Sequence, residues 1–263
     1  MQKSKVKISV WKWQVPRVGN FIGGIWGMVI QSRRVWISGQ FLEAALKVED
    51  GKIVQIYPYG TVKADVDYGT KRIVPGFIDV HTHGAYGFDT NDAEKDGLRN
   101  WMKRIPEEGV TAILPTTVTQ MPDVLTAAVA NVAEVVREGY EGAEILGIHF
   151  EGPYLDMEYK GAQPPEAIAV PSVEQFQMYQ KAANGLIRYI TLAPEHDPEF
   201  ALTRYCKETG VVVSMGHSSA TYEQAMMGIA NGATSMTHVF NGMTPFHHRK
   251  PGLVGTAFRV RDI

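Results

Sequence analysis

The spacing of hydrophobic positions changes near residue 74 and divides the chain into segments. Between residues 28 and 73, short apolar runs alternate with turns, and Asp50-Gly51 between two of these runs is typical of a β-hairpin. We expect residues 28–73 to belong to a small β-domain. Residues 1–27 show neither helical nor strand periodicity, and we expect a poorly ordered N-terminal extension there.

From residue 74 onward, apolar strand-like runs alternate with helical stripes. Residues 110–114 form one such run, and residues 121–137 place their apolar side chains on one helical face. This alternation occurs six times, which indicates an α/β protein with a parallel sheet. A closed TIM (β/α)₈ barrel needs eight such units. We therefore expect residues 74–263 to form an incomplete barrel of about six βα units that lacks its C-terminal strands.

Histidines and one carboxylate follow four of the predicted strands. These residues are His81, His83, Glu151, His217 and His238. The C-terminal ends of parallel barrel strands meet at one mouth, so side chains distant in sequence come together there. A single histidine at a strand end is more often structural, but four with one glutamate favour a metal site. Imidazoles with a carboxylate suit zinc, iron or a similar ion, and five ligands could hold one or two divalent ions with Glu151 bridging.

Composition excludes some classes of partner. The 263 residues are 44% hydrophobic and 21% charged, which fits a globular protein with a substantial core. The net charge of -2 favours neither nucleic acid nor an anionic membrane as a partner. We see no apolar run long enough to span a bilayer. Cys206 is the single cysteine, so an intrachain disulfide is excluded and a cytoplasmic location is expected.

Five motifs carry a resemblance to a known family. Residues 75–84, Pro-Gly-Phe-Ile-Asp-Val-His-Thr-His-Gly, resemble the opening strand motif of the amidohydrolase superfamily. The motifs at residues 149–154, 192–195, 216–218 and 237–243 are similar, in order and spacing, to those of the N-acetylglucosamine-6-phosphate deacetylase branch. The resemblance implies a metal-dependent hydrolase with a TIM barrel and a small β-sandwich, usually a homodimer.

The resemblance also implies roles for individual residues. Glu151, His217 and His238 match the family's principal metal ligands, and His81 and His83 match a second site that only some members retain. The substrate-binding positions implied are Ala162, Gln163, Asn241, Gly242, His248 and Arg249. Arg249 would bind the phosphate of a substrate in the neighbouring subunit, and a planar guanidinium beside His248 and Lys250 suits that task.

The reaction implied is hydrolysis of the acetamide of N-acetylglucosamine 6-phosphate to glucosamine 6-phosphate and acetate, a step of amino-sugar catabolism. The family's proton-donating aspartate would lie beyond Ile263, so we expect no catalytic acid and little activity within these residues alone. Alternatives are an N-acetylgalactosamine-6-phosphate deacetylase or another amidohydrolase. A dihydroorotase-like enzyme would usually bridge its metals with a carboxylated lysine, which Pro194-Glu195 does not supply. The non-enzyme alternative is an inactive fragment or a scaffold homologue, and a scaffold should purify without metal.

Overall fold

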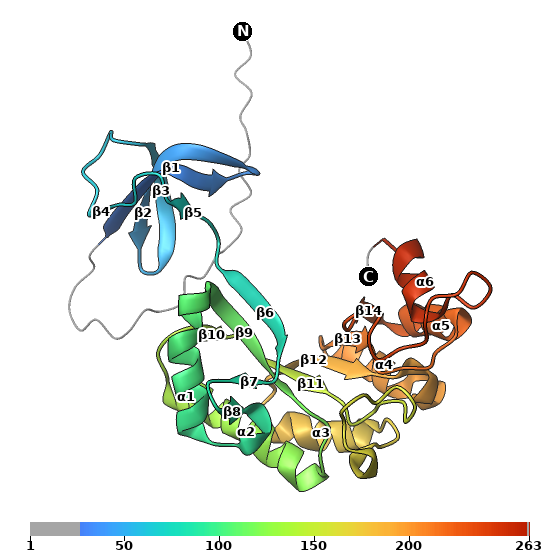
Figure 1. The fold of residues 1–263 in the computed structure, drawn as a ribbon. Coiled ribbons are helices and arrows are strands. Elements are labelled where there is room, and N and C mark those ends of the chain that lie inside the picture. Colours follow the sequence, from blue (N-terminus) through green and yellow to red (C-terminus); the bar gives the residue numbers. More distant parts are fainter. Residues whose placement is uncertain (1–26, 262) are drawn as a thin grey trace. The chain divides into compact units, whose positions relative to one another are not determined.

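The computed structural model describes residues 27–261 and 263, and the expectation for residues 1–26 lies outside this part of the chain. The chain forms two compact units, divided between Phe77 and Ile78 (Figure 1). A bilayer-spanning helix is not found among the described residues, since none combines the necessary length and apolarity.

The first unit is a five-stranded β-sheet. Its strands are β1 (Met28–Ile37), β2 (Gln40–Glu49), β3 (Lys52–Pro58), β4 (Val66–Asp67) and β5 (Arg72–Ile73). The predicted hairpin joins β2 to β3, and Asp50 and Gly51 both have positive φ angles, of 48° and 71°, as a tight turn at this point requires. Val35, Ala44 and Leu46 form a small core on this sheet. Completion of the sheet into a sandwich stays a prediction.

The second unit contains a curved sheet whose strands follow the predicted βα rhythm (Figure 1). Its strands are β6 (Phe77–Thr82), β9 (Val110–Thr117), β10 (Glu144–Ile145), β11 (Ile148–Glu151), β12 (Ile187–Leu192), β13 (Val212–Met215) and β14 (Ala233–Met236). The main order of pairing in the sheet is β9-β11-β12-β13-β14, and each of these pairs is parallel. β10 pairs with β9, also in parallel, and β6 pairs with β9 as well. The predicted incomplete barrel is confirmed.

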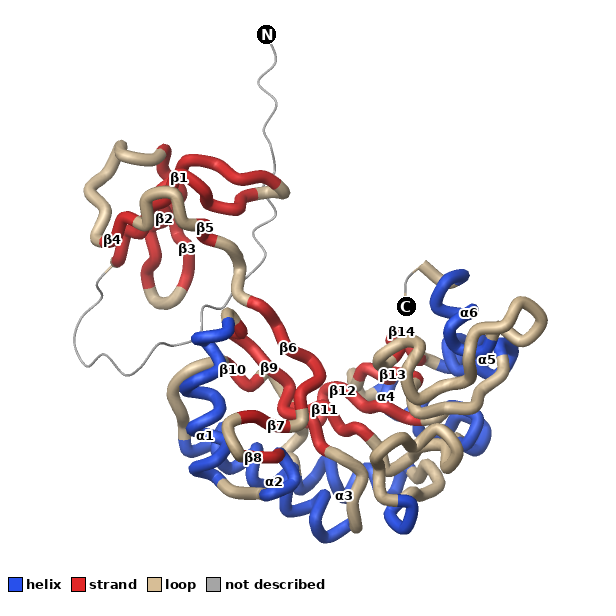
Figure 2. The backbone as a smooth tube through the Cα atoms, viewed as in Figure 1, coloured by secondary structure: helices blue, strands red, loops and turns tan. Residues whose placement is uncertain are grey.

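Helices form an outer layer around this curved sheet (Figure 2). They are α1 (Lys95–Arg104), α2 (Pro122–Glu138), α3 (Val173–Ala182), α4 (Ala201–Glu208), α5 (Tyr222–Asn231) and α6 (Gly252–Arg259). Their apolar faces pack on the strands, with Trp101, Leu125 and Phe176 fully buried beside Phe150 of β11 in one core cluster. Burial of each such side chain stabilises the unit by about 1.5–3 kcal/mol.

Short elements connect the helices and strands. They are the hairpin strands β7 (Gly84–Ala85) and β8 (Phe88–Asp89) and the 3₁₀ turns at Thr90–Asp92, Ile105–Glu108, Pro165–Ala167, Pro194–His196 and Pro198–Phe200. Two connections begin with unusual backbone. His217 follows β13 with a φ of 47°, and His238 follows β14 with a φ of 31°. Non-glycine residues adopt this left-handed region only where surrounding contacts impose it.

Candidate metal centre

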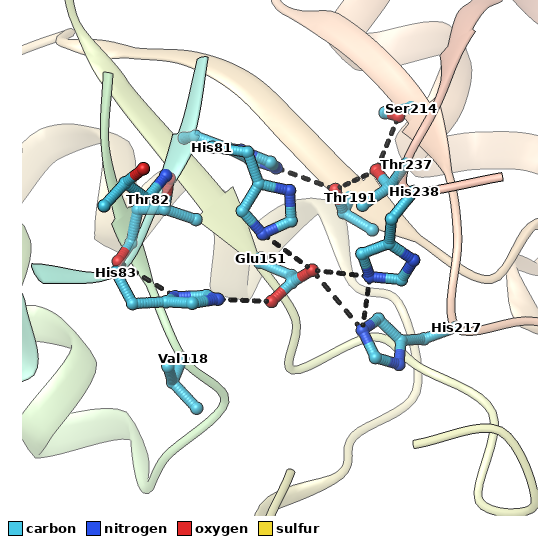
Figure 3. A network of polar contacts seen from close by, with 12 residues as sticks. His81, Thr82, His83, Val118, Glu151, Thr191, Ser214, His217, Thr237 and His238 are labelled. Atoms are coloured by element: carbon cyan, nitrogen blue, oxygen red, sulfur yellow. Dashed lines mark hydrogen bonds and ion pairs between the residues drawn. The ribbon is translucent and has the colours of Figure 1, made fainter. Parts of the chain in front are cut away.

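Glu151 lies at the centre of the cluster that the sequence predicts. It is the last residue of β11 and is only 1% exposed. Four imidazole Nε2 atoms surround its carboxylate (Figure 3). Their distances to Oε1 are 3.2 Å for His81, 3.4 Å for His217 and 3.5 Å for His238, and His83 lies 3.2 Å from Oε2. The structure therefore brings all five predicted ligands together.

Backbone carbonyls fix the orientation of three of these imidazoles. Nδ1 of His83 lies 3.3 Å from the carbonyl oxygen of Thr116. Nδ1 of His217 lies 2.8 Å from the carbonyl oxygen of Tyr159, and Nδ1 of His238 lies 2.8 Å from that of Asn241. A carbonyl can only accept a hydrogen bond, so each Nδ1 carries a proton, and in the neutral form of each ring Nε2 has a lone pair that can bind a metal ion. Metal-binding histidines are oriented in this way in proteins.

The donor set fits a metal cation. The Nε2 atoms of His217 and His238 are 3.1 Å apart, and the buried Oε1 of Glu151 has no hydrogen-bond partner in the described chain. Two tetrahedral ligands at zinc distances of about 2.0–2.1 Å stand roughly 3.3 Å apart. The distances of 3.1–3.5 Å around Oε1 match this spacing. Two triads that share Glu151 meet the requirement: one with His81 and His83, and one with His217 and His238.

The electrostatics of the cluster centre on the Glu151 charge. Burial acts to raise the pKa of the Glu151 carboxyl, but the surrounding imidazoles of His217, His238, His81 and His83 outweigh burial and hold the pKa well below its ordinary value. The contact with Glu151 in turn raises the pKa of His238. Burial lowers the pKa of His83, yet its contacts with Glu151 produce a net increase. Glu151 is therefore a fixed negative charge at the centre of the four rings.

Gln163 lies against Glu151. It is buried, its side-chain Nε2 donates to Oε2 of Glu151 at 2.9 Å, and its Oε1 accepts from the Thr119 amide at 2.7 Å. This amide therefore holds the carboxylate from the side of Oε2 and leaves Oε1 directed toward the histidines. Contact between Gln163 and a substrate stays a prediction.

The other predicted substrate residues divide into two groups. Asn241 supplies the carbonyl that accepts from His238, and Gly242 has a φ of 61° at a position where a Cβ would lie 3.0 Å from Nδ1 of His217. Ala162, His248 and Arg249 are exposed, and within the described residues no hydrogen bond or ion pair joins them to Glu151. Their roles stay predictions.

A buried polar network next to the centre was not predicted from the sequence. His149, 1% exposed, donates from Nδ1 to the Val80 carbonyl at 2.8 Å, so its Nε2 accepts from the Thr191 hydroxyl at 2.7 Å. Because that hydroxyl has one proton, Thr191 accepts in turn from Thr237 at 2.7 Å, and Thr237 accepts from Ser214 at 2.7 Å. Figure 3 shows these three hydroxyls in a row. Burial, followed by the electrostatic effect of the neighbouring His81, lowers the pKa of His149 to about 3, so the His149 ring is neutral.

Comparison with known sequences defines the class of protein. The sequence model of the amidohydrolase family matches residues 72–255, and the chain belongs to this family. The chain is 42% identical over 220 residues to the N-acetylglucosamine-6-phosphate deacetylase of Bacillus subtilis (strain 168), a match that covers 80% of this chain and 55% of that protein. It is 34% identical over 228 residues to the N-acetylgalactosamine-6-phosphate deacetylase of Escherichia coli O157:H7, covering 86% of this chain and 60% of that protein.

Solved structures give the same result. A D-to-A mutant of the N-acetyl-D-glucosamine-6-phosphate deacetylase of Mycobacterium smegmatis, in complex with N-acetyl-D-glucosamine-6-phosphate, superposes with a TM-score of 0.84 at 30% identity. The match covers 90% of this chain and 62% of that structure. The chain thus spans little more than half the length of the relatives it matches. The resemblance predicted from the motifs is confirmed.

Proposed function

We propose that this chain carries the metal-binding part of an N-acetylglucosamine-6-phosphate deacetylase, which hydrolyses the acetamide of that sugar phosphate to glucosamine 6-phosphate and acetate. The observation that carries the proposal is the convergence of four imidazole Nε2 atoms on the buried carboxylate of Glu151. The match to the Bacillus subtilis deacetylase at 42% identity, against 34% for the galactosamine enzyme, supports the choice of sugar.

Glu151, His217 and His238 would hold one divalent ion, and His81 and His83 would hold a second ion with Glu151 between the two. Zinc or iron suits imidazole and carboxylate ligands. An ion of this kind, when bound, lowers the pKa of a water molecule to about 7 and polarises a carbonyl group. The protein contributes preorganisation: the Tyr159 and Asn241 carbonyls keep the two Nε2 lone pairs directed at one point.

Substrate recognition would use the residues around this centre. Asn241 and Gly242 lie three and four residues after His238 and would contact the sugar, as would Ala162 and Gln163. Arg249 lies in an exposed basic turn closed by a bridge between His247 and Lys250. Its planar guanidinium can bind two phosphate oxygens at once, and His248 would add a further donor.

The assembly and location follow from the same proposal. We infer a homodimer in the cytoplasm, with Arg249 reaching the phosphate bound to the neighbouring subunit. The buried free thiol of Cys206 fits a reducing compartment. The phosphorylated amino sugar is the expected partner, and the net charge of -2 supports neither nucleic acid nor a membrane surface.

The test uses the full-length product of the gene. We expect one or two equivalents of zinc or iron by elemental analysis, and acetate release from N-acetylglucosamine 6-phosphate that exceeds release from the galactosamine epimer. Unphosphorylated N-acetylglucosamine is the matched control and should react poorly, since it offers nothing to Arg249. Protein that purifies without metal and cannot be loaded would support a scaffold homologue instead. Faster release from the galactosamine epimer would overturn the choice of sugar alone.

A further inference from the structure

Asp156 makes contacts on several sides of His217 without touching its imidazole. The residue lies in the loop that follows β11 and is 7% exposed. Its backbone N–H donates to the His217 carbonyl at 2.8 Å. Its side-chain Oδ2 accepts from the hydroxyl of Ser219, two residues beyond His217, at 2.8 Å. One aspartate therefore binds the chain at the His217 carbonyl and again two residues further on, at the Ser219 side chain.

The other oxygen of Asp156 organises the acceptor for the ring itself. Oδ1 accepts from the amides of Glu158 at 2.9 Å and Tyr159 at 3.1 Å, which folds residues 156–159 into a tight turn. The carbonyl of Tyr159 at the end of this turn accepts from Nδ1 of His217 at 2.8 Å. The turn, the ring and the His217 carbonyl thus form a closed circuit of hydrogen bonds that begins and ends at Asp156.

The backbone of His217 also has an uncommon conformation. Its φ of 47° lies in the left-handed region, which few non-glycine residues adopt. Glu195 holds the same segment: its Oε2 accepts from the Ser218 hydroxyl and its Oε1 from the Ser219 amide, each at 2.6 Å. Two neighbouring carboxylates therefore hold residues 217–219.

A separate metal site at Asp156, Glu195 and His196 is the competing explanation, since their ligand atoms all lie within 4.8 Å of one another. Both oxygens of Asp156 and both oxygens of Glu195 already accept hydrogen bonds from the protein. His196 itself contacts Oδ2 of Asp156 at 2.7 Å. The cluster has the satisfied geometry of a structural network, whereas Oε1 of Glu151 lacks a donor in the described chain.

We propose that Asp156 is the positioning residue for His217: it fixes the Nδ1–H tautomer of that ring and directs Nε2 at the Glu151 carboxylate. The proposal rests on the proposed function for the identity of the bound ion, but the tautomer and the aim of the ring can be measured without metal.

The experiment compares the protein with its Asp156→Ala and Asp156→Asn variants. Asparagine keeps an oxygen for the two turn amides and offers an N–H to the Ser219 hydroxyl, so it should restore the circuit. Asp96→Ala is the matched control, because that side chain is fully exposed. Two quantities are measured: the affinity for Co²⁺ or Zn²⁺ by competition with a chromophoric chelator, and the imidazole ¹⁵N signals of His217 in metal-free protein, assigned with His217→Gln.

We expect Asp156→Ala to weaken metal binding about 10- to 100-fold, while Asp156→Asn and Asp96→Ala stay within about threefold of the parent. The Nδ1 signal of His217 should be that of a protonated nitrogen in all but Asp156→Ala, where the two tautomers should exchange. If Asp156→Ala does not fold, Asp156→Ser is measured in its place, because the serine hydroxyl can reach the turn amides but not Ser219. Asp156→Ser should bind metal more weakly than Asp156→Asn.

Unchanged affinity and an unchanged His217 signal in Asp156→Ala, or in Asp156→Ser where that variant decides, would overturn the proposal and leave the metal centre intact. A parent protein that binds no metal would overturn the proposed function instead. In that case the ¹⁵N signals alone decide the proposal: loss of the single tautomer in Asp156→Ala supports it, and retention overturns it.

Discussion

The Nε2 atoms of His217 and His238 lie 3.1 Å apart, and in the neutral rings neither atom carries a proton. Each ring donates its Nδ1–H to a backbone carbonyl, that of Tyr159 or of Asn241. The two rings and the buried Oε1 of Glu151 therefore offer three donor atoms to one cation. The first two predictions follow from this arrangement.

Replacement of Glu151 by glutamine should abolish stoichiometric metal binding. The substitution keeps the shape of the side chain but removes the negative charge that both triads share. The folded structure should persist, since the core around Phe150 is unchanged. Metal content after exhaustive dialysis, together with circular dichroism, measures both effects. Glu174→Gln, at an exposed position of α3, is the matched control, and a full metal complement in Glu151→Gln would disprove the ligand assignment.

Metal removal should lower the thermal stability of the protein. An ion that binds only the folded state adds about 2.7 kcal/mol to the free energy of unfolding when its free concentration is a hundred times Kd. For a domain of this size, that corresponds to an increase of roughly 5–10 °C in Tm. Thermal unfolding with zinc, and after treatment with a chelator, measures the difference. The His217→Ala variant should show a smaller zinc-dependent shift, because it loses one of the two triads that share Glu151; a shift equal to that of the parent would place the ion elsewhere.

The sequence predicts the strands and the residues at their ends because both follow from local patterns. Apolar runs and breakers define the strands, and their parallel order places Glu151, His217 and His238 at one mouth without knowledge of any contact. His81 and His83 belong to the same prediction because an i, i+2 pair points to one side of an extended chain.

The orienting partners of the histidines could not be predicted in this way. The carbonyl that receives the His217 proton belongs to Tyr159, 58 residues earlier, in a loop whose fold depends on Asp156. Every residue has a carbonyl, so the sequence carries no signal for which one is used. The motif at residues 149–154 includes His149, but nothing in the motif shows that this ring is buried against Thr191.

Cys206 should be inert toward thiol reagents in the folded protein. Burial, with a smaller contribution from Asp197, raises the pKa of its thiol from an ordinary value of 9.0 to about 12. The reactive species is the thiolate, whose fraction at pH 8 falls about a thousandfold with such a shift. Titration with Ellman's reagent at pH 8 should detect no thiol in native protein and one in denaturant. Rapid reaction of Cys206 with the reagent in native protein would show that α4 opens to solvent.

Replacement of Thr191 by valine should destabilise the protein by about 1–3 kcal/mol, because the change leaves the buried Nε2 of His149 without a donor. The shape of the side chain is retained, so the loss reports the hydroxyl and not a cavity. Urea denaturation measures the free energy of unfolding. Thr191→Ser should recover part of the loss by restoring the hydroxyl. Thr234→Val, at an exposed position of β14, should change little. Equal stabilities for Thr191→Val and Thr234→Val would show that the His149 network contributes nothing to the free energy of unfolding.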